Sequence, residues 1–197
     1  MQKLFRFLSI VFLFIFVSCH SENTGQLLKS NPDDTVNIFP VTSFLKAQLK
    51  RIDSMPVTPL KIVTENGKSD SVWLKREDIR TNAMPFLTPL IDSTTMASLF
   101  SEKSFLDQTV NAFTFSYDAK IKLPDSINLT HWDVYMNPQT KNIDRIYLVK
   151  EKNNSGVNTT TQLTWLVNKW YSIRTITQLS NAQPKIKEEK MIWDFDD

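Results

Sequence analysis

Residues 160–177 read TTQLTWLVNKWYSIRTIT, and this stretch decides the fold class of the chain. Aromatic, β-branched and other apolar residues fill two runs that flank the polar pair Asn168-Lys169. Such residues suit the pleated surface of a sheet, and two such runs around a short polar turn are typical of a hairpin. The stretch therefore predicts two antiparallel strands, at residues 160–167 and 170–177.

The alternation of apolar and polar residues continues on both sides of this hairpin. Trp132, Val134 and Met136 alternate with more polar neighbours, and the polar segment that follows them predicts a turn at residues 137–142. Further strands are expected at residues 110–117, 131–136, 143–150 and 186–195, with a loop at residues 151–158.

The N-terminal third of the chain has helical spacing instead. Apolar residues three and four positions apart predict an amphipathic helix over residues 39–53. The pair Asn66-Gly67 lies between two short apolar runs, and this combination predicts a hairpin with strands at residues 60–64 and 71–75.

A second helical segment is expected after this hairpin. Residues 76–90 have helical character, which Pro85 and Pro89 should shorten or kink. One more helical turn is expected after Asp92-Ser93, through Phe100, because Asp and Ser cap helices.

Together these elements predict a single α+β domain over residues 38–197. A sheet with one apolar face needs a cover on that face, and the N-terminal helices are the candidates. We expect a curved antiparallel meander of about seven strands packed against those helices. The sheet is a candidate to curl into a half-barrel.

The first 18 residues have the features of a secretory signal peptide. Lys3 and Arg6 precede an apolar run at residues 7–17 that only Ser9 interrupts. A helix of that length spans about 16 Å, roughly half the hydrocarbon thickness of a bilayer. The run is therefore too short for a transmembrane helix, and we expect residues 1–18 to be removed.

The only cysteine of the chain, Cys19, follows this run directly. The residues Phe16-Val17-Ser18-Cys19 resemble a bacterial lipobox, with Phe16 in place of the usual leucine. The resemblance is to small envelope lipoproteins of the Bacteroidota type, and it implies that Cys19 carries acyl chains. Two or three such chains anchor a protein stably. The polar residues 19–37 would then tether the domain to a membrane, expected to be the outer membrane.

Removal of the signal peptide changes the charge balance of the chain. It takes away two of the 23 basic residues, Lys3 and Arg6, and leaves as many basic as acidic residues, 21 of each. Nucleic-acid binding needs a clustered basic excess, so we expect no nucleic-acid partner. The expected partners are the membrane, through the lipid, and an envelope protein or a hydrophobic ligand.

The residue counts also restrict the chemistry, because the chain has three glycines, two histidines and one cysteine. Phosphate-binding and nucleophile motifs are absent, and His20 and His131 are too few for a zinc site. We therefore expect no cofactor, no metal and no catalysis. One enzymatic alternative stays open, a hydrolase with paired carboxylates drawn from Asp107, Asp133 and Asp144.

Aromatic residues are concentrated on the expected strands. They are either fillers of the sheet core or ligand-facing residues on a concave apolar surface. The five concerned are Trp132, Trp165, Trp170, Tyr171 and Trp193.

A pair of Asp with Ser or Thr occurs five times, each time followed by an apolar residue or threonine. This pattern resembles the O-glycosylation site of exported Bacteroidota proteins, which implies modification of the hydroxyl. The same pairs start turns and cap helices, so both readings stay open. The candidate positions are Thr35, Ser54, Ser71, Ser93 and Ser126.

These observations favour a cell-envelope lipoprotein with a non-catalytic binding or structural role. The alternative is a carrier or assembly factor for hydrophobic cargo, broadly similar to the half-barrel lipoprotein-localisation proteins. A carrier predicts a pocket lined by the strand aromatics, whereas a structural module predicts that they are packed.

Overall fold

The computed structural model describes residues 38–92, 94–124, 126–180 and 182–195. About half of these residues belong to strands, and the described helices are few and short. In chain order the elements are α1 (Val41–Asp53), β1 (Leu60–Glu65), β2 (Lys68–Trp73), α2 (Asp78–Asn82), the 3₁₀ helix η1 (Met84–Leu87), α3 (Thr94–Leu99), β3 (Phe100–Asp107), β4 (Ala112–Ala119), β5 (Leu129–Met136), β6 (Ile143–Asn154), β7 (Val157–Leu166), β8 (Trp170–Leu179) and β9 (Lys185–Ile192).

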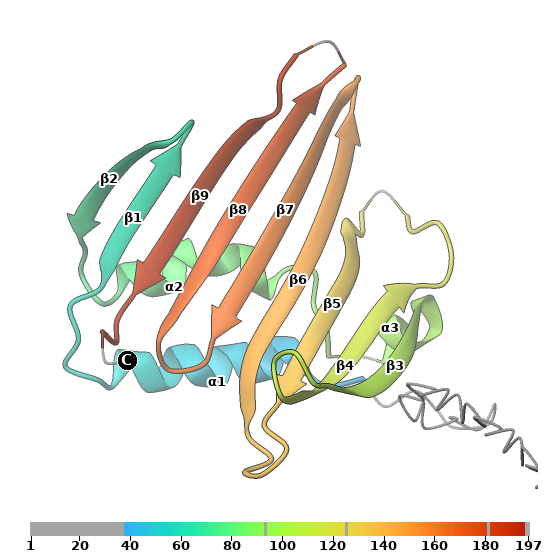
Figure 1. The fold of residues 1–197 in the computed structure, drawn as a ribbon, viewed down its shortest axis with the longest axis horizontal. Coiled ribbons are helices and arrows are strands. Elements are labelled where there is room, and N and C mark those ends of the chain that lie inside the picture. Colours follow the sequence, from blue (N-terminus) through green and yellow to red (C-terminus); the bar gives the residue numbers. More distant parts are fainter. Residues whose placement is uncertain (1–37, 93, 125, 181, 196–197) are drawn as a thin grey trace, which may run out of the picture.

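The described strands form one open antiparallel sheet of nine strands, in the order β2-β1-β9-β8-β7-β6-β5-β4-β3 (Figure 1). Strands β3 to β9 are a meander in which each strand pairs with the next one in the chain. The hairpin β1–β2 joins the far side of this meander, because β1 pairs with β9. The prediction of an antiparallel sheet is confirmed, and the count of about seven strands is wrong.

One strand that the sequence pattern does not indicate is β3. Its sequence, FSEKSFLD, mixes charged and apolar residues, and most of its side chains are only partly buried at the sheet edge. The helical turn expected through Phe100 ends at Leu99, and Phe100 already belongs to the strand. The edge position explains the weak pattern, because only one side of β3 pairs with a neighbour.

The Asn66-Gly67 hairpin forms as predicted. Asn66 and Gly67 both have positive φ angles, 50° and 78°, and Glu65 pairs with Lys68 across the turn. Positive φ at both central positions matches the right-handed twist of the two strands, and Asn-Gly adopts it readily.

Two other expected elements differ from the structure. The helix expected over residues 76–90 is divided into α2 and η1, because Pro85 cannot continue an α-helix. The loop expected at residues 151–158 is mostly strand, since β6 and β7 continue to a short turn at Ser155-Gly156. Both turn residues have positive φ angles, 47° and 84°, which a Ser-Gly pair tolerates.

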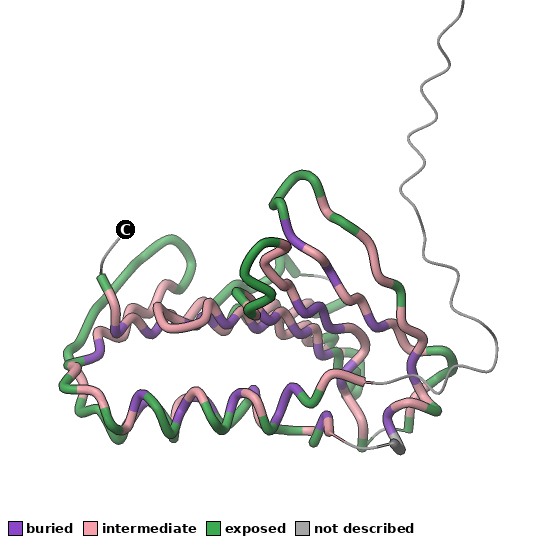
Figure 2. The backbone as a smooth tube through the Cα atoms, turned by 90° about the horizontal axis from the view of Figure 1, so that it is seen from below, coloured by how far each residue is buried: buried purple, intermediate pink, exposed green. Residues whose placement is uncertain are grey.

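The core lies between one face of the sheet and the helical layer, as Figure 2 shows with buried segments of α1 and of the strands facing each other. The helix contributes Val41, Leu45, Leu49 and Ile52, each at most 2% exposed. Neighbouring strands contribute residues from one face, paired in register. These are Trp132, Val134, Ile146, Leu148, Leu163, Trp165, Tyr171 and Met191.

Polar contacts attach the helical layer to the sheet and to itself. The hydroxyl of Tyr171 donates to the carbonyl of Ile79 over 3.2 Å. The backbone N–H of Ile91 donates to the Thr42 hydroxyl over 2.9 Å. The buried Lys150 ammonium donates to the carbonyls of Pro85 and Thr88.

Candidate functional site

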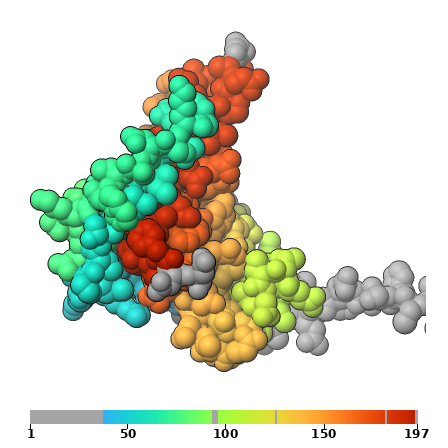
Figure 3. All heavy atoms as spheres, turned by 60° about the vertical axis from the view of Figure 1, so that its left-hand side comes forward, coloured from blue at the N-terminus to red at the C-terminus, as the bar shows by residue number. Residues whose placement is uncertain are grey.

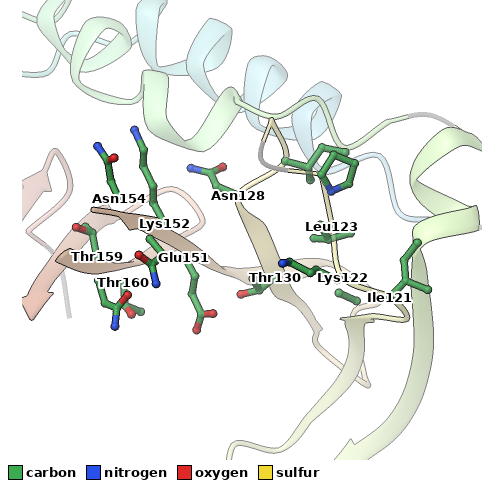
Figure 4. Close-up of a pocket in the computed structure, with 15 residues that line it drawn as sticks. Ile121, Lys122, Leu123, Asn128, Thr130, Glu151, Lys152, Asn154, Thr159 and Thr160 are labelled. Atoms are coloured by element: carbon green, nitrogen blue, oxygen red, sulfur yellow. The ribbon is translucent and has the colours of Figure 1, made fainter. Parts of the chain in front are cut away.

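A cavity lies at the end of β6, where that strand is longer than its neighbour β5. Leu129, the first residue of β5, pairs with Lys150, so residues 152–154 of β6 have no β5 residue beside them. The connection between β4 and β5 forms the opposite wall. We call this space the β6 notch; its volume is about 820 Å³ (Figure 4).

The wall of the β6 notch combines two kinds of surface. One side is aliphatic and comes from the end of β4 and the connection after it, and the other side is polar and comes mainly from β6 and β7. None of the described residues that line it is aromatic. The aliphatic set is Ala119, Ile121, Leu123, Pro124 and Ile127, and the polar set includes Asn128, Thr130, Asn153, Asn154, Asn158, Thr159 and Thr160.

The backbone of β6 is available at this edge. The N–H of Glu151 donates to the carbonyl of Asn128 over 2.7 Å, so Glu151 directs its backbone groups toward β5. Successive residues of a strand direct their backbone groups to opposite sides. Asn153, two residues after Glu151, therefore directs its N–H and C=O to the same side as Glu151 does. Beyond Asn128 this side of β6 is open, whereas the other side remains paired with β7, Asn153 facing Asn158.

The described lining of the notch also includes the charged residues Lys122, Glu151 and Lys152. In Figure 4, Lys152 and Asn154 point to the same side of β6, as residues two positions apart on a strand do. The notch can therefore offer amide, hydroxyl and main-chain groups to a ligand, beside an aliphatic wall.

Four of the five aromatic residues from the sequence prediction are packed in the core. Trp165 stacks on Tyr171 at 5.2 Å between ring centroids and lies 5.5 Å from Trp193. Trp132 lies between Phe100 and Tyr117, and the distances between its ring centroid and theirs are 4.5 and 4.6 Å. Their packing is that of core fillers, and none of them lines the β6 notch.

The fifth aromatic residue, Trp170, lies on the other face of the sheet. It precedes the core residue Tyr171 on the same strand, so its side chain points away from the helices. The ammonium of Lys190 lies 4.3 Å from its ring centroid, a cation–π contact.

The histidine expected on a strand, His131, lies on this outer face between two carboxylates. Its Nδ1 is 2.8 Å from Asp118 and its Nε2 is 3.1 Å from Asp133. The hydrogen bond with Asp133 has the largest effect and, with Asp118, raises the pKa of His131 to about 9 although partial burial opposes it. Both ring nitrogens are therefore engaged, and the imidazolium acts as an ionic bridge between two strands.

The three carboxylates proposed for a hydrolase lie on different strands. Asp133 bridges to His131 and accepts from the Tyr135 hydroxyl, whereas Asp107 accepts from Thr109. Asp144 lines a second cavity of about 550 Å³ between α1 and two strand turns. In the described part of the chain, no cluster of three or more His, Cys, Asp or Glu residues could hold a metal ion.

Three of the candidate glycosylation positions have described surroundings. Ser54 ends α1, Ser71 lies on the edge strand β2, and Ser126 lies in the β4–β5 connection beside the notch, all of them exposed. Cys19, Thr35 and Ser93 lie outside the described residues.

No protein-family model matches this chain, and no curated protein is significantly similar to it in sequence. None of the described helices has the length and apolar character needed to span a membrane.

Proposed function

We propose that this chain is an exported envelope lipoprotein, anchored through Cys19, whose domain binds a ligand in the β6 notch without catalysis. The observation that carries the binding role is the notch itself. It is an open space of about 820 Å³ in which strand backbone, amides and hydroxyls face an aliphatic wall. A concave site with convergent polar groups and an apolar wall is typical of ligand binding.

The N-terminal segment supports the envelope location. Basic residues, an apolar run and Ser18-Cys19 occur in the order that a lipoprotein signal requires. Acyl chains on Cys19 would attach the domain to the membrane through residues 19–37, with the polypeptide outside the bilayer.

A carrier for hydrophobic cargo is a second candidate, and one observation favours it. The indole N–H groups of Trp132, Trp165 and Trp193 are buried and have no hydrogen-bond partner among the described residues. A buried donor without a partner costs about 1–3 kcal/mol. A lipid carbonyl or ester that reached these groups under a displaced helical layer would satisfy them.

Lipid attachment is tested by labelling with a palmitate analogue in a bacterium that processes lipoproteins. The wild-type chain should incorporate the label and partition with membranes, and Cys19→Ser should do neither. Ser21→Ala is the matched control, because it changes a neighbouring polar residue and leaves the Cys in place. Label retained in Cys19→Ser would overturn the anchor.

Native mass spectrometry of a chain beginning at His20 separates the two binding roles. Its missing residues 1–19 all lie outside the described sheet and core. A lipid-sized adduct that is lost on denaturation would establish the carrier. A mass free of lipid would count against the carrier and leave the notch as the binding site. Extra mass that survives denaturation would indicate covalent modification, as at Ser54, Ser71 or Ser126.

A further inference from the structure

We propose that the ligand of the β6 notch is an extended peptide segment of a partner protein, which pairs with the free edge of β6 as an added strand. This inference rests on the proposed binding role of the notch and specifies its ligand. It is carried by the unequal lengths of neighbouring strands, by the direction of backbone groups on β6, and by the chemistry of the lining.

The strand lengths leave an empty position in the sheet. Strand β6 extends from Ile143 to Asn154, whereas β5 covers it only as far as Lys150, and Asn128 adds one more contact to Glu151. Strand β4 ends at Ala119, whose side chain lines the notch. The space beside residues 152–154 therefore continues the row that β5 occupies, between the end of β6 and the chain that follows β4 (Figures 1 and 4).

The free backbone groups of β6 match a peptide strand. Asn153 directs its N–H and C=O into this row. The N–H of Glu151 donates to Asn128 on this side, and every second residue of a strand directs its backbone groups to the same side. A ligand residue opposite Asn153 in antiparallel orientation would exchange two hydrogen bonds with it, because Asn153 directs both its N–H and its C=O into this row, as the residues of a hydrogen-bonded pair do. Addition of a strand to an exposed sheet edge is a common mode of peptide recognition, in which main-chain bonds provide the affinity.

The side chains of the notch favour a peptide over the other ligand classes. Sugar sites commonly use aromatic platforms, and the described lining has none. A lipid tail would have to lie beside Asn128, Asn154 and Lys152, whose polar groups it could not satisfy. An extended peptide can place one side chain on the aliphatic wall at Ile121 and Leu123 while its amides meet the side chains of Asn128 and Asn154.

The test uses a random heptapeptide library displayed on phage, selected against the chain beginning at His20. Enriched peptides are synthesised and titrated calorimetrically against the parent chain and three variants. Asn153→Pro removes the free N–H and places a ring in the vacant row, yet leaves the ladder to β7 intact because this N–H points the other way. Asn153→Ala is the matched control, since it removes only the side chain. Ile121→Asp changes the opposite wall at an exposed position.

The expected result is a loss of at least tenfold in affinity for Asn153→Pro, with Asn153→Ala within about threefold of the parent. Peptide saturation should also slow hydrogen exchange at the Asn153 amide of the parent chain at least tenfold, a measurement that needs no variant.

Two results would overturn the inference. The first is the absence of any enriched heptapeptide. The second is a peptide that binds Asn153→Pro as well as the parent and leaves the Asn153 exchange unchanged. If Ile121→Asp still weakens that peptide, the notch remains a binding site and only strand addition fails. If Ile121→Asp has no effect either, the proposed location of the binding site fails as well.

Discussion

His131 is the residue whose charge matters most to the outer face of the sheet. Its imidazolium joins Asp118 on β4 to Asp133 on β5, and Asp118 also pairs with Lys103 on β3 at 3.2 Å. The burial of Asp133 tends to raise the pKa of that carboxyl, but its bonds to His131 and Ser116 outweigh burial and hold the pKa below the usual value. These ion pairs therefore link the three consecutive strands β3, β4 and β5 while His131 is charged.

Replacement of His131 by glutamine should destabilise the protein at pH 6 and much less at pH 9.5. The folded pKa of about 9 exceeds the ordinary 6.5, so the stabilisation is complete below pH 6.5 and is lost as the pH rises through 9. This difference between the folded and the ordinary pKa of His131 contributes at most about 3 kcal/mol to the free energy of unfolding. Urea unfolding of wild type and His131→Gln across this range measures it, and a pH-independent difference would refute the ionic bridge.

Lys150 has the opposite pH dependence. Its side chain is 7% exposed, and burial lowers the pKa of its ammonium to about 8 from an ordinary 10.5. Because the unfolded chain binds this proton more tightly, stability conferred by Lys150 should rise between pH 8 and 10.5, by up to about 3 kcal/mol. Urea unfolding of wild type and Lys150→Met at pH 7.5 and 10.5 tests this. The free energy of unfolding of the wild type should increase relative to that of the variant at the higher pH. A difference that does not change with pH would contradict the prediction.

Among the elements, the hairpin β1–β2 depends on one glycine. Gly67 has φ +78°, and a Cβ placed there would meet nothing within 4 Å. Gly67→Ala should therefore destabilise the chain by about 1 kcal/mol through backbone strain alone. Gly67→Asn is the control, because asparagine tolerates this conformation better and should cost less than alanine. Thermal unfolding of both variants measures the effect, and equal melting temperatures for the two would show that the conformation of the turn is not limiting.

The elements that the sequence predicts well are those with a local signal. Helix α1, the Asn66-Gly67 turn and the existence of strand β5 each need only neighbouring residues, and all three agree with the structure, although burial along β5 does not alternate strictly. Strand β3 has no such local signal. Its pairing with β4, and not local propensity, keeps it extended. The ends of β6 and β7 are also polar, and only the Ser155-Gly156 pair in the sequence indicates a hairpin turn there.

The β6 notch could not be predicted from residue types. It arises from a difference in length between β5 and β6 and from the path of the chain after β4, both of which are properties of the assembled sheet. Asn128, Asn153 and Asn158 each begin an Asn-X-Ser/Thr triplet, but this motif indicates a glycosylation acceptor and does not indicate a free strand edge. The aromatic residues carried a stronger signal, yet aromatics suit a sheet core and a binding surface equally well.

At the scale of the whole molecule, the last strand joins the two parts of the sheet. Strand β9 lies between β8 and β1, and Figure 3 shows the N-terminal hairpin in blue-green against the C-terminal strands in red. Its residue Met191 is 1% exposed and pairs with both Tyr171 and Lys61.

Removal of residues 185–197 should therefore unfold more than one edge. The hairpin β1–β2 loses its partner, and the core loses Met191 and Trp193. We expect the truncated chain to lack a cooperative thermal transition, and loss of near-ultraviolet circular dichroism measures this. Removal of only residues 196 and 197 is the control and should leave the transition unchanged. A cooperative transition in the longer truncation would show that β9 is dispensable.

The pairing of β1 with β9 also sets an order of events in time. A ribosome releases Leu60–Glu65 long before Lys185–Ile192, and so does a translocation channel that is entered N-terminus first. Until the final strand emerges, the hairpin has no partner on one side and the apolar face of α1 has only part of its sheet. The pairing of β1 with β9 is therefore a late contact, and until it forms the free edge of β1 is exposed to pairing with another copy.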